Sequence, residues 1–430
     1  MNSSATVGNR PDRKVAVASL IGTTIEYYDF AVYGTAAALV FGPAFFPTGD
    51  SATSTLAAFL SFTAAFIARP IGVVLFGTVG DRYGRKPALL LSLLLMGGAT
   101  VAVGLLPTYG SVGLLAPVLL VILRLIQGVS LGGEWGGAVL LVAEHSPPRK
   151  RATFASIPQV GPPLGFLLSS AVVLPILSFA GTDGFRDYGW RIPFLLSLLL
   201  IVVGLWVRST VDESPRFAEV ARKHTGAKFP IGTLLRQHPG KVALGIGAAT
   251  GGSACFFMVI VYALSYGTAA LKIPQPTMLA AVSAGAAAAA LATIPAACLA
   301  DKYGRKPVMI TGAIATILCS LPMFGLMSTR NGLVMALAFT VGLCVFVLMF
   351  GPMAAYLPEL FPTHLRYSGA SATFIIANTL GGGFAPIVAT WLNSHWKSPL
   401  VLGVYTGLLC VVSLACILAL PETKDWEFSD

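Results

Sequence analysis

The sequence predicts an all-α membrane protein with twelve transmembrane helices, arranged as two pseudo-symmetric bundles of six. Composition is the first observation: 55% of the 430 residues are hydrophobic, only 11% are charged, and the mean hydropathy is +0.79. Soluble globular domains carry about 25% charged residues. The second observation is a series of apolar segments about 20 residues long, the length that a helix needs to cross a bilayer. The third is an internal duplication.

The duplication is clearest in a polar motif that lies between apolar segments. Residues 80–87 read Gly-Asp-Arg-Tyr-Gly-Arg-Lys-Pro, and residues 300–307, 220 positions later, read Ala-Asp-Lys-Tyr-Gly-Arg-Lys-Pro. A glutamate followed seven residues later by an arginine recurs after 215 positions, and Glu213-Ser214-Pro215 is matched by Glu422-Thr423-Lys424 after 209. Markers in one order at nearly one spacing predict a transporter built from two related halves.

Apolar segments and the polar stretches between them place the predicted helices. We expect spans near 15–41, 54–79, 88–107, 115–143, 152–178, 191–208, 241–266, 278–300, 308–327, 332–357, 366–391 and 398–420. The predicted domains are a cytoplasmic N-terminus (1–14), a first six-helix bundle (15–208), a cytoplasmic linker (209–240), a second six-helix bundle (241–420) and a cytoplasmic tail (421–430).

The net charge of +10 reflects membrane topology rather than nucleic-acid binding. Of the 28 Lys and Arg residues, 21 fall on one side of the predicted spans, 5 on the other and 2 inside. Because Lys and Arg collect on the cytoplasmic side, we expect both termini in the cytoplasm, in a multi-pass protein of the cell (inner or plasma) membrane. Glu26 and Asp29 interrupt the first apolar segment, which indicates a retained helix rather than a signal peptide.

Neither metal binding nor catalysis has a sequence motif here. The six cysteines all lie in apolar segments of the second half, without the spacing of metal or redox sites. No phosphate loop or nucleophile–base pair is present, and we expect the protein not to be an enzyme. We expect no cofactor other than a proton gradient. The expected partners are a small-molecule substrate, protons and the lipid bilayer, with no nucleic acid and with the monomer as the working unit.

Ionisable residues fall in the middle of predicted spans, and all of them belong to the first half: Glu26, Asp29, Arg69, Arg124 and Glu134. Charge inside a membrane is costly and usually functional. Counted from the ends of their spans, Asp29 and Arg124 lie within about one helical turn of the same depth, and Glu26 and Arg69 also match.

Helical periodicity supports these pairs, because Asp29 shares a face of the first span with Tyr33, and Arg124 shares a face of the fourth with Gln127. We predict that Asp29 and Arg124 form an ion pair that opens when a proton or an anionic substrate arrives. The alternative is a permanent pair that only joins two helices.

The remaining buried charges have a less specific interpretation. For Glu26 with Arg69, a structural ion pair is favoured over a coupling role. Glu134 lies among glycines that suit close packing or a bend, and it is either a second proton site or a structural contact.

Polar and aromatic residues at mid-span positions are the predicted substrate contacts. They are Tyr33, Arg124, Gln127, Trp135, Gln159, Tyr262, Tyr266 and Asn378. Aromatic and amide groups with one or two cations suit a small hydroxylated or keto acid. Prolines around Gln159 break the helical hydrogen bonding of the fifth span, which a membrane protein tolerates where the backbone lines a cavity.

Charged residues of the repeated motifs are the predicted cytoplasmic gate. They are Asp81, Arg82, Arg85, Lys86, Glu144, Arg151, Asp301, Arg305, Glu359 and Arg366. We expect those of each half to cluster at the cytoplasmic mouth. The alternative is that they only fix the topology.

Taken together, these motifs resemble the major facilitator superfamily over essentially the whole chain. Within it, the strings Glu-Tyr-Tyr-Asp-Phe (26–30), Arg-Pro-Ile-Gly (69–72), Arg-Leu-Ile-Gln-Gly (124–128) and Gly-Gly-Glu-Trp (132–135) resemble the metabolite:proton symporter branch. Members of that branch carry shikimate, oxoglutarate, citrate and other organic acids, or proline and betaine. The resemblance implies the major facilitator fold, alternating access, and latches of charged residues that join the two bundles in the outward-open state.

The sequence departs from the family pattern at two places. Thr78 stands where many members have a histidine, so no proton role is assigned there, and the chain ends ten residues after Leu420, without the long tail of osmosensing proline/betaine members. We therefore predict proton-coupled uptake of a small organic acid or related metabolite. The alternatives are a proton-driven drug or metabolite exporter and a proline/betaine-like zwitterion symporter, whereas a membrane enzyme or channel is disfavoured.

Overall fold

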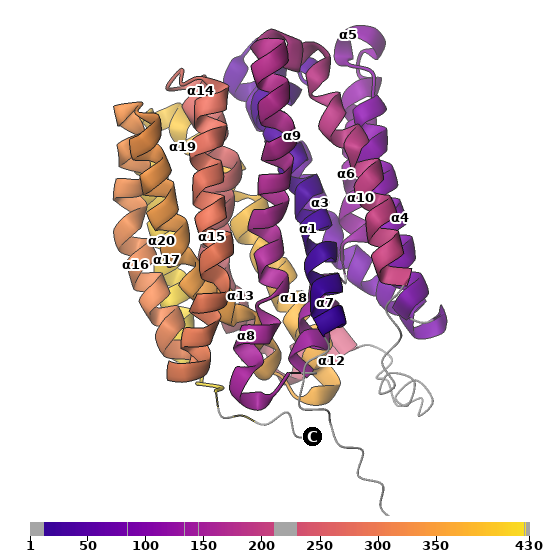
Figure 1. Cartoon of the computed structure of the whole chain (residues 1–430), viewed down its shortest axis with the longest axis vertical. Helices are drawn as coiled ribbons and strands as arrows, with labels where there is room; N and C mark the ends of the chain where they lie inside the picture. The colour runs from indigo at the N-terminus through magenta and orange to yellow at the C-terminus, as the bar shows by residue number, and fades with distance from the viewer. Residues whose placement is uncertain are drawn as a thin grey trace, which may run out of the picture.

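The computed structural model describes residues 13–83, 85–132, 134–144, 146–209, 230–424 and 426. Throughout these residues the regular structure is helical, and long helices stand side by side in one bundle (Figure 1). Nine helices in the described ranges are long and apolar enough to cross a membrane, and Leu90–Leu105 and Arg191–Val207 are shorter apolar helices. With α1, which carries the acidic residues, they correspond to the twelve predicted spans, so the predicted fold class is confirmed.

The first half runs from α1 to α10. Its helical elements are α1 (Arg13–Ala36), η1 (Ala37–Phe41), α2 (Gly42–Phe45), α3 (Ser51–Tyr83), α4 (Arg85–Leu105), α5 (Tyr109–Val112), α6 (Leu115–Ser130), α7 (Glu134–Glu144), η2 (Pro148–Lys150), α8 (Arg151–Ala155), η3 (Pro158–Val160), α9 (Gly161–Gly184), η4 (Phe185–Gly189) and α10 (Arg191–Ser209). Two predicted spans are thus interrupted: the fourth between α6 and α7, next to its glycines, and the fifth between α8 and α9, at its prolines.

The second half runs from α12 to α20. Its elements are α12 (Pro230–Gln237), α13 (Pro239–Phe257), η5 (Met258–Tyr262), α14 (Ala263–Ala269), α15 (Gln275–Tyr303), α16 (Arg305–Gly325), η6 (Leu326–Thr329), α17 (Gly332–Glu359), η7 (Thr363–Leu365), α18 (Arg366–Asn378), η8 (Thr379–Gly383), α19 (Ala385–Trp396) and α20 (Pro399–Ala419). Helix α12 lies inside the predicted linker and buries Leu234 against this half. Residues 210–229 of that linker lie outside the described ranges.

Capping residues fix where several helices begin. Asn331 accepts hydrogen bonds from the amides of Leu333 and Val334 at the start of α17. Before α3, Asp50 accepts from the hydroxyl and the amide of Thr53, and these bonds hold the pKa of the exposed Asp50 carboxyl below its usual range. Gly304 joins α15 to α16 with a φ of 109°, a conformation that residues with a Cβ rarely adopt.

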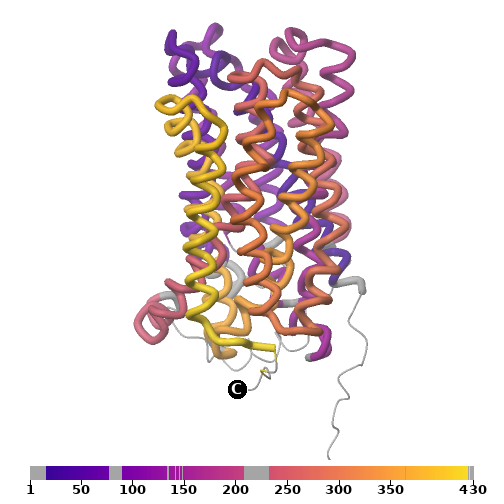
Figure 2. The backbone as a smooth tube through the Cα atoms, turned by 90° about the vertical axis from the view of Figure 1, so that its left-hand side faces the viewer, coloured from indigo at the N-terminus to yellow at the C-terminus, as the bar shows by residue number. Residues whose placement is uncertain are grey.

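The two halves face each other along several pairs of elements, among them α9 against α15, α8 against α15 and α17, α7 against α18, and α3 against α19. Figure 1 shows α9 and α15 in the middle of the bundle, with α16 and α20 on one side and α4 and α10 on the other. We call the end of the bundle that contains the α15–α16 turn and α8 the hinge end, which is at the bottom of Figure 1. The segment after α20 turns across this end (Figure 2).

Small residues let α3 and α6 approach closely within the first half. A Cβ added to Gly128 would overlap the backbone of Ala65, and one added to Gly132 would overlap the backbone of Arg69. Glycines at helix crossings allow this kind of backbone contact in membrane proteins. The close crossing brings Arg69 of α3 and Arg124 of α6 to the same side of α1.

Candidate functional site

Four charged side chains of the first half are buried together between α1, α3 and α6. Glu26, Asp29, Arg69 and Arg124 are each at most 4% exposed. We call these four residues the charge cluster. They point into the protein rather than toward lipid, as the prediction from span depth and helix face required. The side chain of Glu134, at the start of α7, lies outside the described set.

Glu26 and Arg69 form an ion pair, with 3.4 Å between Oε1 of Glu26 and Nη2 of Arg69. The Arg69 guanidinium also lies against two aromatic rings, with its carbon 4.5 Å from the centre of Phe30 and 4.7 Å from the centre of Phe66. Aromatic faces attract cations most strongly where water is absent. The Arg69 guanidinium thus lies between one carboxylate oxygen and two aromatic rings, and the structural role favoured for this pair stays a prediction.

Arg124 has a different environment, because no carboxylate forms an ion pair with it among the described side chains. Its Nη1 donates to Oε1 of Gln127 at 2.9 Å, and its Nη2 donates to the carbonyl of Phe62 at 3.1 Å. Its guanidinium carbon lies 3.8 Å from the centre of the Tyr33 ring, and its Nε has no acceptor. A buried cation without a bound anion is costly, so Arg124 is suited to receive one.

A chain of hydrogen bonds connects Arg124 to Asp29. Gln127 accepts from Arg124 through its Oε1, and its Nε2 donates to the hydroxyl of Thr100 at 2.6 Å. This hydroxyl in turn donates to Oδ2 of Asp29 at 2.8 Å. The predicted direct ion pair between Asp29 and Arg124 is thus corrected to a linkage through two neutral side chains. Sequence reasoning missed Thr100, which lies on α4, because an isolated threonine in an apolar helix has no distinctive pattern.

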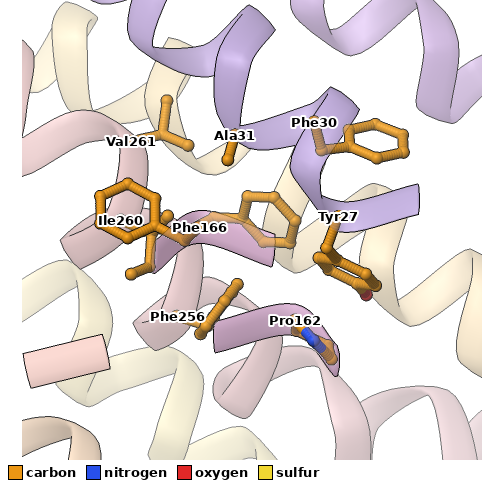
Figure 3. Close-up of a pocket in the computed structure, with 9 residues that line it drawn as sticks. Tyr27, Phe30, Ala31, Pro162, Phe166, Phe256, Ile260 and Val261 are labelled. Atoms are coloured by element: carbon orange, nitrogen blue, oxygen red, sulfur yellow. The ribbon is translucent and has the colours of Figure 1, made fainter. Parts of the chain in front are cut away.

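A small apolar cavity lies next to the charge cluster, where α1 and α9 of the first half meet α13 and η5 of the second (Figure 3). It is lined by Tyr27, Phe30, Ala31, Pro162, Phe166, Phe256, Phe257, Ile260 and Val261. Its volume of about 10 Å³ has room for roughly one water molecule and not for an organic acid. Phe30 both lines this cavity and contacts the two arginines of the charge cluster.

None of the predicted substrate contacts lines this cavity, and their role in substrate binding stays a prediction. Tyr33 donates to or accepts from Ser61 at 2.7 Å behind Arg124, and the Tyr262 hydroxyl donates to the carbonyl of Ala389 at 3.0 Å. Tyr266 stacks on Tyr262 within the second half. These side chains are packed into the bundle, because aromatic rings with a satisfied hydroxyl are stable in the interior.

Trp135 and Gln159 join the two halves instead. The Trp135 indole donates to Oε1 of Gln159 at 2.9 Å, and Nε2 of Gln159 donates to the carbonyl of Phe350 in α17 at 3.2 Å. Trp135 also stacks on Phe374 of α18, with 3.6 Å between the ring centres. Asn378, the last predicted contact, is buried at the end of α18, and its Nδ2 has no acceptor.

At the hinge end, charged residues link the halves directly. Nη1 of Arg151 lies 3.0 Å from Oε1 of Glu359, and Nη2 of Arg305 lies 3.2 Å from the same oxygen. Asp301 accepts from the amides of Ala152 and Thr153 at 3.0 and 2.8 Å, so it caps α8 of the other half. Three of the four predicted gate residues of the second half, Asp301, Arg305 and Glu359, thus cluster here with Arg151 of the first.

Of the remaining predicted gate residues, the structure describes the side chains of Glu144 and Arg366. Glu144, which corresponds to Glu359 in the duplication, is exposed, and Arg366 is buried at the start of α18. Backbone positions place Asp81 and Arg82 at the end of α3 and Arg85 and Lys86 at the start of α4, but the side chains of residues 77–89 lie outside the described set.

The segment after α20 completes the hinge-end network. The Glu422 carboxylate accepts from the amides of Arg305 and Lys306 at 3.0 and 2.9 Å, at the N-terminus of α16. The Thr423 hydroxyl donates to Oε2 of Glu359 at 2.6 Å, and the carbonyl of Trp426 accepts from Nη1 of Arg151 at 3.0 Å.

The halves also touch beside and beyond the cavity. The Thr63 hydroxyl donates to the carbonyl of Gly383 at 2.6 Å, and the Thr379 hydroxyl donates to the carbonyl of Phe66 at 3.3 Å. Farther from the hinge end, η1 packs against α14. With contacts on both sides of a cavity of this size, the arrangement is occluded.

Comparisons with known proteins match this architecture. A family profile described as "Sugar (and other) transporter" matches residues 14–241, and one described as "Major Facilitator Superfamily" matches residues 242–430. The chain belongs to the major facilitator superfamily. Its members are transporters rather than enzymes, and the predicted resemblance is confirmed.

Several curated relatives of this major facilitator protein match nearly its whole length. The inner membrane metabolite transport protein YhjE of Escherichia coli is 42% identical, with 96% of this chain and 94% of the relative covered. The shikimate transporter of E. coli is 35% identical, with 98% and 99% covered, and the proline/betaine transporter of Salmonella typhimurium is 32% identical, with 96% and 84% covered.

Solved structures confirm the fold. A partially occluded inward-open structure of the xylose transporter XylE from E. coli has a TM-score of 0.76 and 21% identity, and covers 96% of this chain and 99% of that one. The chain is therefore a multi-pass membrane transporter with the major facilitator fold.

Proposed function

We propose that this transporter is a proton-coupled symporter that takes up a small organic acid by alternating access. The observation that carries this proposal is Arg124, a buried guanidinium that hydrogen-bonds to neutral acceptors and has no carboxylate in ion-pair contact among the described side chains. A carboxylate cargo would supply the missing anion through charge-assisted hydrogen bonds, which are stronger than those to neutral acceptors.

Coupling to protons follows from the link between Arg124 and Asp29. While Asp29 is ionised, the positive charge of Arg124 stabilises it through Gln127 and Thr100. When a cargo carboxylate neutralises Arg124, this stabilisation is lost, and burial then favours protonation of Asp29. Cargo and proton therefore bind together, and the loaded site carries no added net charge across the membrane interior.

The distribution of Lys and Arg residues indicates how the protein is oriented in the membrane. The hinge end carries most Lys and Arg residues, so we propose that it faces the cytoplasm with both termini. The contacts of Glu359 and Asp301 across the halves at this end would then form the cytoplasmic gate, which must open to release the cargo. The working unit in this proposal is the monomer.

A second function, proton-driven export of an apolar compound, is favoured by one observation: the cavity is lined by aromatic and aliphatic side chains. An exporter of this kind would bind apolar cations or neutral compounds and would exchange them for protons. The two functions predict opposite directions of proton movement relative to cargo.

Purified protein in liposomes distinguishes them. A labelled panel of shikimate, 2-oxoglutarate, citrate, proline, betaine and xylose is offered with an acidic exterior, and an internal dye reports pH. Symport of an acid gives accumulation of that acid together with acidification of the lumen. Accumulation of proline or betaine alone would indicate that the cargo is a zwitterion and not an organic acid. If no compound of the panel is taken up, and an apolar dye leaves the liposomes when the pH gradient is imposed, export is favoured.

A further inference from the structure

The Thr100 hydroxyl has one hydrogen and two acceptors within hydrogen-bond distance. Its Oγ1 lies 2.8 Å from Oδ2 of Asp29 and 3.0 Å from the carbonyl oxygen of Met96, one turn earlier in α4. The same oxygen accepts from Nε2 of Gln127 at 2.6 Å. Thr100 is fully buried, so no water competes for these bonds.

A hydroxyl donates one hydrogen bond and accepts two. While Asp29 is ionised, the Thr100 hydrogen points to Oδ2 of Asp29. When Asp29 is protonated, its own O–H donates to the free lone pair of Thr100, and the Thr100 hydrogen turns to the Met96 carbonyl. Gln127 keeps its bond in both arrangements. A rotation about one bond therefore satisfies Asp29 in either protonation state.

Among the described side chains, three charged groups lie near Asp29. Glu26 lies one turn earlier on α1, with Arg69 of α3 paired to it, and Arg124 of α6 is reached through Gln127. Helices α9 and α10, which also pack on α1, carry charged residues only near their ends. Thr100 contacts both the Asp29 carboxyl and Gln127, which in turn contacts Arg124.

We propose that Thr100 is a positioning residue for proton coupling, whose hydroxyl reverses direction as Asp29 gains or loses its proton and so stabilises both protonation states of Asp29 without disturbing the bond to Gln127. This inference rests on the proposed function, in which Asp29 carries the proton. It assigns no contact with the cargo to Thr100.

The direct test is infrared difference spectroscopy of the purified full-length protein in lipid, over a series of pH values. The C=O stretching band of protonated Asp29 is the band that Asp29→Asn abolishes. Without an acceptor for the Asp29 O–H, this band shifts to higher frequency in Thr100→Val and in the smaller Thr100→Ala, and Thr100→Ser restores it. A band at the wild-type frequency in both hydroxyl-free variants would overturn the proposal.

The matched control is Thr316→Val. Thr316 is buried in α16, which begins in the second copy of the repeated polar motif as α4 begins in the first. Its hydroxyl donates to the Gly312 carbonyl one turn earlier, with no carboxylate beside it in the described structure. This variant removes the same group from a helix of the same kind and leaves the Asp29 band in place. A shift as large as that of Thr100→Val would indicate a general packing effect and overturn the proposal.

Transport separates the inference from the function on which it rests. With shikimate, 2-oxoglutarate and citrate as probes, Thr100→Val lowers acid-driven proton uptake by about tenfold or more, the effect of losing a hydrogen bond to a charged group, and Thr100→Ser restores it. Equal proton uptake in this variant and the wild type overturns the role of Thr100 alone. A wild type that takes up none of these acids, and shows no Asp29 band, overturns both.

Discussion

The guanidinium carbon of Arg124 lies 3.8 Å from the centre of the Tyr33 ring, so this buried cation rests on an aromatic face instead of a carboxylate. Such an arrangement holds the Arg124 guanidinium in position when no anion is bound to it. It also assigns separate tasks to the ring and the hydroxyl of Tyr33, because the hydroxyl bonds to Ser61 on α3.

Tyr33→Leu is therefore expected to weaken acid binding by about 2-fold to 30-fold, the loss of a cation–π contact of about 0.5–2 kcal/mol. Tyr33→Phe keeps the ring and is expected to stay within about threefold of the wild type, although it loses the bond to Ser61. The half-saturation concentration in counterflow measures both. Equal weakening in the two variants would assign the effect to the hydroxyl instead.

A variant without the Asp29 carboxylate distinguishes exchange of the acid across the membrane from its accumulation against a gradient. We expect Asp29→Asn to catalyse counterflow of the acid but not its accumulation under a pH gradient, because an amide of the same size cannot carry the proton. Asp183→Asn, the same change at an exposed position near the end of α9, is the control and keeps accumulation. Gradient-driven accumulation in Asp29→Asn would rule out Asp29 as the proton carrier.

The duplicated glutamates Glu359 and Glu144 provide a matched pair for the gate. Glu359 contacts Arg151 and Arg305 in a buried setting, whereas Glu144 is exposed. Removing one partner of a buried ion pair costs about 3–5 kcal/mol, so Glu359→Gln lowers the thermal unfolding temperature in detergent, and Glu144→Gln changes the free energy of unfolding by less than about 0.5 kcal/mol.

The same pair of variants reports on opening. Ala152 of α8 is fully buried at the interface of the halves, where its amide donates to Asp301 of α15, whereas Cys298 is exposed. With Cys298→Ser as the background, we expect faster maleimide labelling of Ala152→Cys when Glu359→Gln is added than when Glu144→Gln is added, because the hinge end opens more often. Unchanged labelling would assign these charges to topology alone.

The crossing of α3 and α6 depends on the absence of a side chain at Gly128. Gly128→Ala forces the helices apart at the Ala65 backbone, and overpacking of this kind costs about 1–3 kcal/mol. Gly98→Ala, on the exposed side of α4 with nothing within 4 Å of the added carbon, is expected to be neutral or stabilising by up to about 1 kcal/mol. Thermal unfolding compares the two, with counterflow showing whether Arg124 still binds the acid.

Sequence reasoning predicted the fold and the buried charges because both rest on strong local signals. Apolar length identifies spans, and Glu26, Asp29, Arg69 and Arg124 stand out because charge is so rare inside a membrane. The position of Arg69 opposite Glu26 followed from depth alone. Both breaks, at the glycines near Glu134 and the prolines near Gln159, were also visible in the sequence.

The rest of the site depends on contacts that no local pattern contains. Thr100 is one of many threonines that donate to the carbonyl one turn earlier, and only its neighbour Asp29 makes it different. Trp135 and Gln159 were predicted to line a cavity. In the occluded structure they bond to each other, and Gln159 also bonds to the carbonyl of Phe350 in the second half. Depth and helix face place a residue in one half, and the packing of two halves decides what it touches.

Charged residues enter the membrane interior only in the first half, since those of the second half all lie at the ends of its spans or in its loops. In the proposed mechanism, the cation, the acid and the hydroxyl that joins them therefore all belong to one repeat. A chimaera that joins this first half to the second half of another family member is then expected to retain proton coupling.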